Sequence, residues 1–89
     1  MSWNRLRRDE CPHRAQLDES VRSDAERCAV CGLGEDLRLC LTCGFVGCCE
    51  SHAAHDTAHW RGTGHPFIRP HRVEDARWLW CYACDAFLD

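Results

Sequence analysis

The chain is unusually rich in side chains that bind metal ions. It contains nine cysteines and six histidines in 89 residues. Six of the cysteines form three Cys-x-x-Cys pairs, namely Cys28/Cys31, Cys40/Cys43 and Cys81/Cys84. Two thiolates at this spacing can bind one tetrahedral zinc ion, and imidazole nitrogens are suitable further ligands. The pattern therefore predicts zinc sites built from cysteine and histidine together.

Disulfides, redox chemistry and haem attachment explain the cysteines less well. The opening residues, MSWNRLRRDE, contain no apolar segment of a secretory signal. An odd number of cysteines accompanied by histidines is not typical of a disulfide scaffold. A redox role needs one pair, and haem attachment needs a histidine where this chain has Gly32, Gly44 and Asp85. We therefore expect a reduced, cytoplasmic, metal-stabilised protein.

One sequence motif is compatible with an enzyme that uses a metal ion. His55-Asp-Thr-Ala-His59 is similar to the helical zinc motif of metallopeptidases, with Asp56 in place of the glutamate that activates water. A metal-dependent hydrolase with an open zinc at His55 and His59 is therefore an alternative. However, the cysteine pairs can complete any site that these histidines join, and a zinc ion with four protein ligands has no place for water. We expect a protein that is not an enzyme.

Charge and composition argue against nucleic acids and membranes as partners. Eleven basic residues, all arginine, stand against fourteen acidic ones, and the net charge is −3. The second cysteine pair followed by His55 and His59 nearly matches a DNA-reading finger, but a duplex-binding module needs a basic face. Glu50 and Asp56 stand where base-reading side chains would be expected. No apolar run reaches membrane-spanning length. Exclusive use of arginine is typical of GC-rich, for example bacterial, genomes.

The elements that must position these ligands form a small α+β domain with a twisted antiparallel sheet and one main helix. We expect a polar arm over residues 1–10 and the domain over 11–89. Alternating leucines predict a half-buried strand over 37–41, with 45–48 as its returning partner. Prolines at both ends of 66–70 predict an edge strand. Residues 78–82 are expected to be the last strand.

Two helical segments are expected. Spacing of apolar residues over 14–27 predicts a short helix or an ordered loop. The main helix is expected over 50–61, ended by Gly62, with His52, His55 and His59 near one face.

Three further candidate ligands have simpler interpretations. Cys49 adjoins Cys48 and cannot easily share its ion, so a packed or half-exposed thiol is expected. His52 is expected to face solvent on the helix or to substitute for His55. His71, between a proline and an arginine, is expected in a surface loop.

The order of the motifs resembles the UBP-type zinc finger, the ubiquitin-binding domain of ubiquitin-specific proteases and of one histone deacetylase. The motifs C-x-H, C-x-x-C, C-x-x-C-G-x-x-x-C, H-x-x-x-H, G-H-P and W-C-x-x-C follow one another over residues 11–87. The three-zinc form of this family implies three zinc ions in cross-braced sites. The implied ligand sets are Cys11, His13, Cys81 and Cys84; Cys28, Cys31, Cys48 and His55; and Cys40, Cys43, His59 and His65.

The resemblance also implies a pocket for a free C-terminal Gly-Gly tail. In the family, aromatic residues line this pocket and an arginine holds the tail carboxylate. Trp80 and Tyr82 match the aromatic pattern, although residues so placed in a small domain could equally belong to the core. Phe87 stands where a tyrosine would, Glu50 takes the arginine position, and Arg38 stands where a tryptophan would. Because a carboxylate at Glu50 repels a carboxylate tail, the tail-binding chemistry is expected to be altered.

We therefore expect a monomeric, non-catalytic zinc module that binds a protein or peptide by its C-terminal tail. A ubiquitin-like partner fits this expectation better than ubiquitin itself. Besides the hydrolase, a structural subunit that docks on a larger complex through Trp3 and Trp78 remains an alternative.

Overall fold

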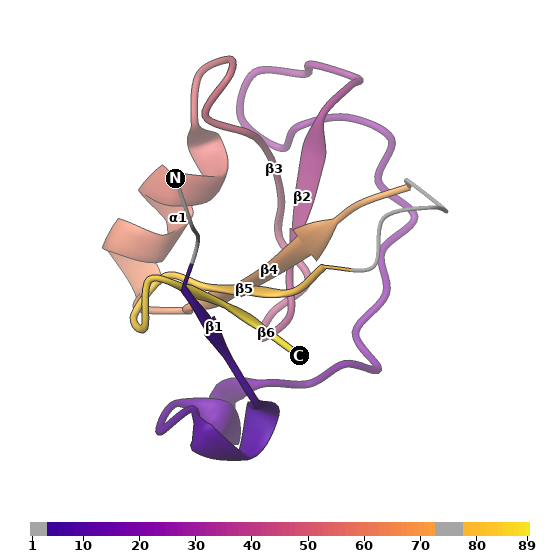
Figure 1. The fold of residues 1–89 in the computed structure, drawn as a ribbon. Coiled ribbons are helices and arrows are strands. Elements are labelled where there is room, and N and C mark those ends of the chain that lie inside the picture. The colour runs from indigo at the N-terminus through magenta and orange to yellow at the C-terminus, as the bar shows by residue number, and fades with distance from the viewer. Residues whose placement is uncertain (1–3, 73–77) are drawn as a thin grey trace.

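The computed structural model of the protein describes residues 4–72 and 78–89. Its elements are β1 (Arg5–Leu6), a 3-10 turn (Arg8–Glu10), a second 3-10 turn (Arg14–Gln16), β2 (Leu37–Cys40), β3 (Val46–Cys48), α1 (His55–Thr63), β4 (Phe67–Pro70), β5 (Trp80–Cys81) and β6 (Ala86–Leu88). The six strands of these residues form one sheet in the order β1-β6-β5-β4-β2-β3, with α1 against β3 and β2 (Figure 1). The predicted small α+β domain with one main helix is confirmed.

The sheet is mixed rather than purely antiparallel. All neighbouring strands pair antiparallel except β1 and β6, which pair in parallel with Arg5 opposite Phe87 and Leu6 opposite Leu88. Residues of the expected polar arm thus supply an edge strand. Backbone bonds from Phe87 N to Asn4 O, 2.9 Å, and from Asp89 N to Leu6 O, 2.7 Å, hold it there.

The prediction of residues 66–70 as an edge strand is wrong, since β4 lies between β2 and β5. The prolines do not prevent this because they stand at its ends. Pro66 precedes the strand and Pro70 is its last residue, so neither missing N–H interrupts the strand's interior. The carbonyl of Pro66 accepts a bond from Tyr82 N at 2.8 Å.

Residues 78–82 are not the last strand either. β5 covers only Trp80–Cys81, and the chain then reverses and returns as β6. The reversal coincides with the Cys81/Cys84 pair, where Asp85 takes a φ of 53°. The Cys81/Cys84 pair therefore lies at the hairpin turn between β5 and β6, whereas the sequence pattern predicted that this pair closes the last strand.

The main helix starts at His55, five residues later than expected. The chain first makes a tight turn in which Ala54 N donates to Cys49 O at 3.1 Å and Ala54 has a φ of 54°. At the other end, Gly64 rather than Gly62 ends the helix. Gly64 takes a left-handed φ of 78° and its N–H bonds to Trp60 O at 2.8 Å.

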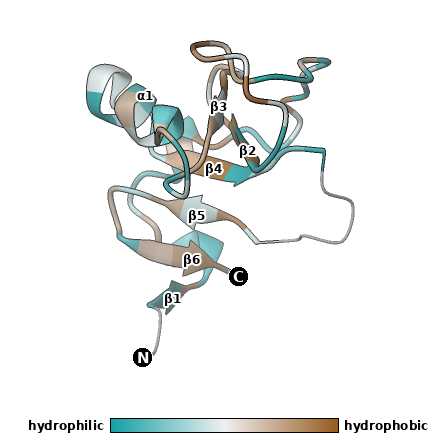
Figure 2. Cartoon of the chain, turned by 90° about the horizontal axis from the view of Figure 1, so that it is seen from above, coloured by the Kyte–Doolittle hydropathy of each residue, from teal (hydrophilic) through white to brown (hydrophobic). Residues whose placement is uncertain are grey.

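The apolar core lies on the strands and not under the helix. Leu37, Leu39, Val46, Phe67 and Leu88 are among its buried members, and hydrophobic colour is prominent on β3, β4 and β6 (Figure 2). Within α1, by contrast, the only buried residue is an aspartate. The helix is therefore not held by apolar burial, which makes its histidines important to its attachment.

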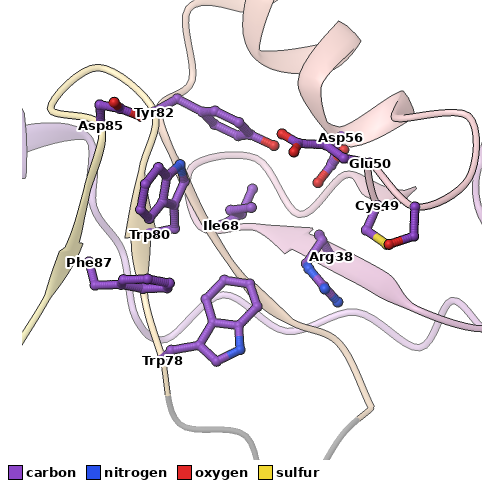
Figure 3. A pocket seen from close by; sticks show the side chains of 11 residues that line it. Arg38, Cys49, Glu50, Asp56, Ile68, Trp78, Trp80, Tyr82, Asp85 and Phe87 are labelled. Carbon is purple, nitrogen blue, oxygen red and sulfur yellow. The ribbon is translucent and has the colours of Figure 1, made fainter. Parts of the chain in front are cut away.

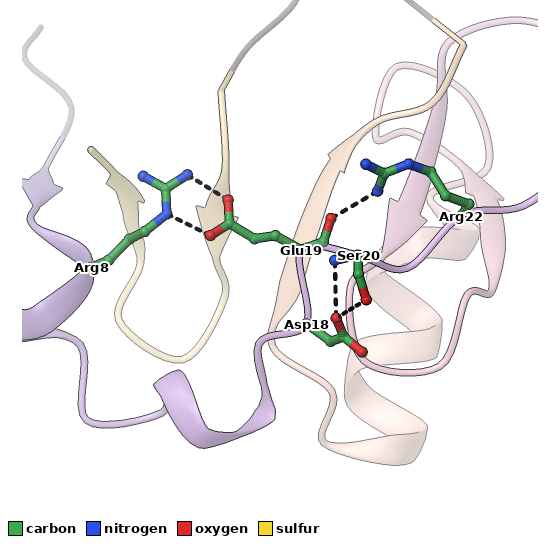
Figure 4. Close-up of polar contacts among 5 residues, drawn as sticks. All are labelled: Arg8, Asp18, Glu19, Ser20 and Arg22. Atoms are coloured by element: carbon green, nitrogen blue, oxygen red, sulfur yellow. Dashed lines mark hydrogen bonds and ion pairs between the residues drawn. The ribbon is translucent and has the colours of Figure 1, made fainter.

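The segment between the arm and β2 is an ordered loop after one 3-10 turn. Arg8 donates two hydrogen bonds to the Glu19 carboxylate at 2.7 and 3.0 Å, and Arg22 donates to the Glu19 carbonyl at 2.7 Å (Figure 4). Asp18 accepts from Ser20 N at 2.9 Å and donates its own N–H to Leu41 O at 2.8 Å. The bond to Leu41 holds the loop beside the residue that follows β2, and the other bonds hold the loop together and to the first 3-10 turn.

None of the helices in the described part of the chain has the length and hydropathy needed to cross a bilayer.

Candidate metal centres and candidate binding pocket

Three groups of four cysteines and histidines lie in different parts of the fold. In each group the donor atoms are all within 4.8 Å of one another. Cluster one contains Cys11, His13, Cys81 and Cys84; cluster two contains Cys28, Cys31, Cys48 and His55; cluster three contains Cys40, Cys43, His59 and His65. The structure thus groups these twelve residues as the family resemblance implies.

Cluster one ties the start of the chain to its end. Cys84 Sγ lies 3.5 Å from Cys11 Sγ and 3.4 Å from His13 Nδ1, and Cys11 Sγ lies 3.9 Å from Cys81 Sγ. Ligands of a tetrahedral zinc ion with zinc–sulfur bonds of about 2.3 Å are roughly 3.8 Å apart. The four atoms have the separations that one such ion requires. Burial raises the pKa of the Cys81 thiol to about 12, and a bound cation would favour its thiolate form.

Cluster two attaches the first turn of α1 to β3 and to the loop before β2. His55 Nδ1 lies 3.4 Å from Cys28 Sγ and 3.3 Å from Cys48 Sγ, and Cys31 Sγ lies 3.9 Å from Cys48 Sγ. Val30 N donates to Cys28 Sγ at 3.4 Å. Burial opposes ionisation of the Cys28 thiol, but backbone N–H groups of Cys31 and Val30 help to outweigh it and the pKa falls to about 6. The backbone thus favours a thiolate here.

Cluster three attaches the end of α1 to the turn between β2 and β3. Cys43 Sγ lies 3.8 Å from Cys40 Sγ and 3.3 Å from His59 Nε2. The Phe45 ring stacks on His59 at 4.2 Å between centroids and so fixes its orientation. Burial, and to a lesser extent the charge of His65, lowers the pKa of His59, which favours the neutral imidazole that binds metals.

An unsatisfied nitrogen in cluster three fits a bound metal. Among the described residues, His65 Nδ1 is buried yet has no hydrogen-bond partner. A buried polar atom without a partner costs free energy, and a zinc ion bound to this imidazole would satisfy its free nitrogen. The donor set of two thiolates and two imidazoles is typical of closed structural zinc sites.

The two histidines of the peptidase-like motif belong to different groups. His55 lies in cluster two and His59 in cluster three, and no group of described residues contains both. Asp56 does not face a shared metal either. It is 4% exposed, accepts a bond from Thr57 N at 2.7 Å, and burial raises its pKa. The sequence similarity to a zinc peptidase motif is not matched by the geometry.

The three leftover ligands do not all behave as expected. Cys49 is a packed thiol, 7% exposed, as predicted. His52 precedes α1 instead of lying on it, and its Nε2 is 2.9 Å from Asp36 Oδ2. The prediction of His71 as a surface residue is wrong, because the loop before β2 covers it. Its Nε2–H donates to Ala25 O at 2.7 Å and only 7% of the residue is exposed.

A cavity of about 420 Å³ lies between β5 and the turn before α1 (Figure 3). All five candidate peptide-binding residues line it, namely Arg38, Glu50, Trp80, Tyr82 and Phe87. Sequence reasoning did not identify the six other lining residues as part of a pocket, namely Cys49, Ser51, Asp56, Ile68, Trp78 and Asp85. They come from the turn before α1, α1, β4, the residues before β5 and the β5–β6 turn, so only the fold brings them together.

One side of the cavity is aromatic. Trp80 and Phe87 pack edge to face at 4.8 Å between centroids, and Phe87 packs likewise on Trp78 at 5.8 Å. Arg38 lies across the Trp78 ring, with its guanidinium carbon 4.9 Å from the centroid. Within the described part of the chain, Arg38 is the one arginine that lines the pocket; it is stacked on the aromatic wall, and no ion pair joins it to Glu50.

The opposite side is acidic and hydrogen-bonded. Thr57 Oγ1 donates to Glu50 Oε1 at 3.2 Å and lies 3.2 Å from the Tyr82 hydroxyl. Burial raises the pKa of Tyr82, so its hydroxyl stays protonated and can donate. Among the described residues, three carboxylates, those of Glu50, Asp56 and Asp85, and one guanidinium, that of Arg38, line this cavity. Its charge disfavours an anionic ligand.

Comparison with known proteins gives consistent matches. The family model described as a zinc finger in ubiquitin hydrolases and other proteins matches residues 28–89. The ubiquitin carboxyl-terminal hydrolase 14 of Schizosaccharomyces pombe is 32% identical over 91 residues, covering 84% of this chain and 11% of that protein. The human BRCA1-associated protein is 33% identical over 76 residues, covering 82% of this chain and 12% of that protein. The chain thus spans only about a tenth of the length of these relatives.

A solved structure has the same fold. The solution NMR structure of a protein from Rhodopseudomonas palustris superimposes with a TM-score of 0.74 at 37% identity. The match covers 89% of this chain and 80% of that one. It includes more of the chain than the family match, which begins at residue 28.

Proposed function

Because the chain belongs to the UBP-type zinc-finger family, we propose that it is a non-catalytic zinc module that binds a protein or peptide in the pocket between β5 and the turn before α1. The observation that carries this proposal is the cavity itself. It gathers the five candidate residues from β2, the turn before α1, β5, the β5–β6 turn and β6 into one aromatic and acidic site. Cavities of this size with a few polar groups are the usual form of ligand sites.

The zinc ions of this module have a structural role. Clusters one, two and three would each hold one ion through all four residues, which gives three ions per chain. Four protein ligands complete a tetrahedron and leave no position for a reacting water. Zinc would thus serve as a cross-link between distant segments of the chain. The placement of His55 and His59 in two different clusters gives no support to a hydrolase that uses both histidines at one zinc ion.

The partner is a protein or peptide segment that binds without a contact between a terminal carboxylate and an arginine. Glu50 lies on the pocket wall beside Asp56, so a free carboxylate would meet like charges. A ubiquitin-like protein, or an internal peptide segment, suits this pocket better than the free end of ubiquitin. The module would act as a monomer in the cytoplasm, and its acidic charge offers no face for nucleic acid.

A structural subunit that docks through exposed tryptophans has less support. Trp78 is half-buried in the pocket and covered by Arg38. Trp3 lies outside the described residues. Trp78 is thus better explained as part of the pocket than as a separate docking contact.

Titration of a peptide library against the zinc-loaded protein tests the proposal, read out by fluorescence of the pocket tryptophans. Peptides that bind should lose affinity with Tyr82→Ala, which removes a pocket wall, and keep it with Val30→Ala. Val30 is 62% exposed and lies outside the cavity lining. Equal affinity for wild type and Tyr82→Ala would show that the pocket is not the binding site.

A further inference from the structure

A fourth group of metal-binding side chains lies outside the three clusters. The donor atoms of Asp36, Cys49 and His52 are all within 4.8 Å of one another. The group contains one carboxylate, one thiol and one imidazole. From the sequence, Cys49 was expected to be a packed thiol and His52 a solvent-facing residue or a substitute for His55. Nothing in the sequence spacing indicated Asp36.

The sheet register brings these residues together. Leu37 of β2 pairs with Cys48 of β3, so Asp36 and Cys49 are the next residues beyond this pair on the two strands. Cys49 N donates to Asp36 O at 3.1 Å, which extends the pairing by one bond. The distance between the two side chains is therefore set by backbone bonds of the core sheet.

The turn before α1 adds the third donor. His52 N donates to Cys49 O at 3.0 Å, which places the two residues three positions apart on one tight turn. His52 Nε2 lies 2.9 Å from Asp36 Oδ2. Asp36 itself holds a left-handed φ of 51°, a conformation that aspartate and asparagine adopt more readily than most residues. All three side chains are thus held by ordered backbone.

Exposure differs between the three donors in a way that suits an accessible ion. Cys49 is 7% exposed, whereas the side chains of His52 and Asp36 are 30% and 57% exposed. An ion held here would sit with its sulfur ligand inside and its nitrogen and oxygen ligands at the surface. With three protein ligands, a tetrahedral ion keeps one position for water or another ligand.

We propose that Asp36, Cys49 and His52 form an additional, solvent-accessible site for a divalent transition metal, with zinc as the best match to these donors. Thiolate, imidazole and carboxylate are all zinc ligands, and the mixture is too soft for magnesium or calcium. The proposal does not depend on the proposed peptide binding. The additional metal site and the peptide pocket are nevertheless neighbours, because Cys49 and Glu50 belong to the same turn and both line the cavity.

The ion in this site should be the weakest bound. It has one ligand fewer than an ion in a complete four-residue cluster, and it is open to water. In a chelator titration it should therefore be released first, while the fold remains intact. This separates it from the structural ions, whose loss should unfold the chain.

Zinc binding to the full-length chain, measured by equilibrium dialysis and elemental analysis, tests the proposal. At saturation the wild type should bind one ion more per chain than His52→Ala. Asp36→Asn should weaken binding of the additional ion by more than about 100-fold, because residues that only support a ligand typically cost about 10–100-fold when they are replaced. Glu35→Gln is the matched control, since Glu35 is an exposed carboxylate next to Asp36 but outside the group, and it should bind as the wild type does.

Cobalt provides a second measurement that does not depend on counting ions. Wild type loaded with Co²⁺ should show a thiolate-to-metal absorption component that is missing from His52→Ala and from Cys49→Ala. His52 and Asp36 are exposed, so their variants are expected to fold even if Cys49→Ala does not. Equal zinc content and equal cobalt spectra for wild type and His52→Ala would overturn the proposal and leave an Asp36–His52 ion pair beside a buried thiol.

Discussion

Gly47 of β3 lies directly against Asp56 in the first turn of α1. A Cβ added at Gly47 would be 2.9 Å from Asp56 N and 2.8 Å from the Phe45 ring. Real side chains do not tolerate such distances to backbone, so only glycine allows the helix to approach the sheet this closely. The contact also positions His55, whose carbonyl carbon would be 3.1 Å from the same Cβ.

Gly47→Ala should therefore destabilise the zinc-loaded protein by about 1–3 kcal/mol, the usual range for overpacking. Because the clash pushes on the turn that carries His55, the variant should also lose zinc from cluster two more easily. Denaturant unfolding at a fixed free zinc concentration measures the first effect and chelator titration the second. Gly62→Ala is the control, because a Cβ there meets nothing within 4 Å. It lies inside the helix and should stabilise by about 0.5–1 kcal/mol; equal effects of the two substitutions would contradict this account.

Removal of zinc should unfold the protein and not merely loosen it. The core is small, and α1 buries no apolar side chain, so its attachment depends on His55, His59 and the stacking of Trp60 on Tyr82 at 5.8 Å between centroids. A domain of this size cannot offset chain entropy with so few buried residues. Elemental analysis should give three tightly held zinc ions per chain, and excess chelator should abolish the circular dichroism of the fold. A folded spectrum in the absence of metal would contradict the structural role of the clusters.

The nine cysteines should differ in how much their loss destabilises the fold. Cys31→Ser removes a thiolate from cluster two, whereas Cys49→Ser removes a buried thiol that belongs to none of the three four-residue clusters. The melting temperature should fall further in Cys31→Ser than in Cys49→Ser. A mild chelator should also remove zinc from Cys31→Ser at a concentration at which Cys49→Ser keeps its structural zinc ions. Equal melting curves for the two variants would count against the assignment of Cys31 as a ligand.

The sequence predicted the metal-binding groups better than the sheet that carries them, for a physical reason. Cysteine and histidine spacings are local, and the motif order of the family specifies which segments meet. Strand neighbours depend on contacts between distant segments. The parallel pairing of β1 with β6 and the place of β4 inside the sheet therefore went unpredicted, because neither the two-residue strand Arg5–Leu6 nor a proline-bounded segment carries a local signal for its partner.

The same distinction explains the residues that sequence reasoning misjudged. Asp36 belongs to no motif, and its nearness to Cys49 follows only from the pairing of Leu37 with Cys48. His71 was expected at the surface because nothing in its neighbourhood indicates that the loop near Ala25 covers it. The five pocket residues were found through the family pattern, whereas Trp78 and Asp85 required the fold.

The charge at residue 50 should decide which peptide ends the pocket accepts. A peptide ending in a free Gly-Gly carboxylate would approach Glu50, whose Oε1 is bonded to Thr57, and Arg38 is engaged with Trp78. Loss of a charge-assisted contact costs about 2 kcal/mol and repulsion adds to it, so the wild type should bind such a tail with a Kd of roughly tens of micromolar or weaker. Glu50→Arg should create or strengthen this binding, and amidation of the peptide's carboxylate should abolish the gain. Calorimetric titration of one peptide in both forms measures this, with Glu35→Arg as a control for net charge. Tight binding of the wild type to the free tail of ubiquitin would show that Glu50 does not exclude a carboxylate.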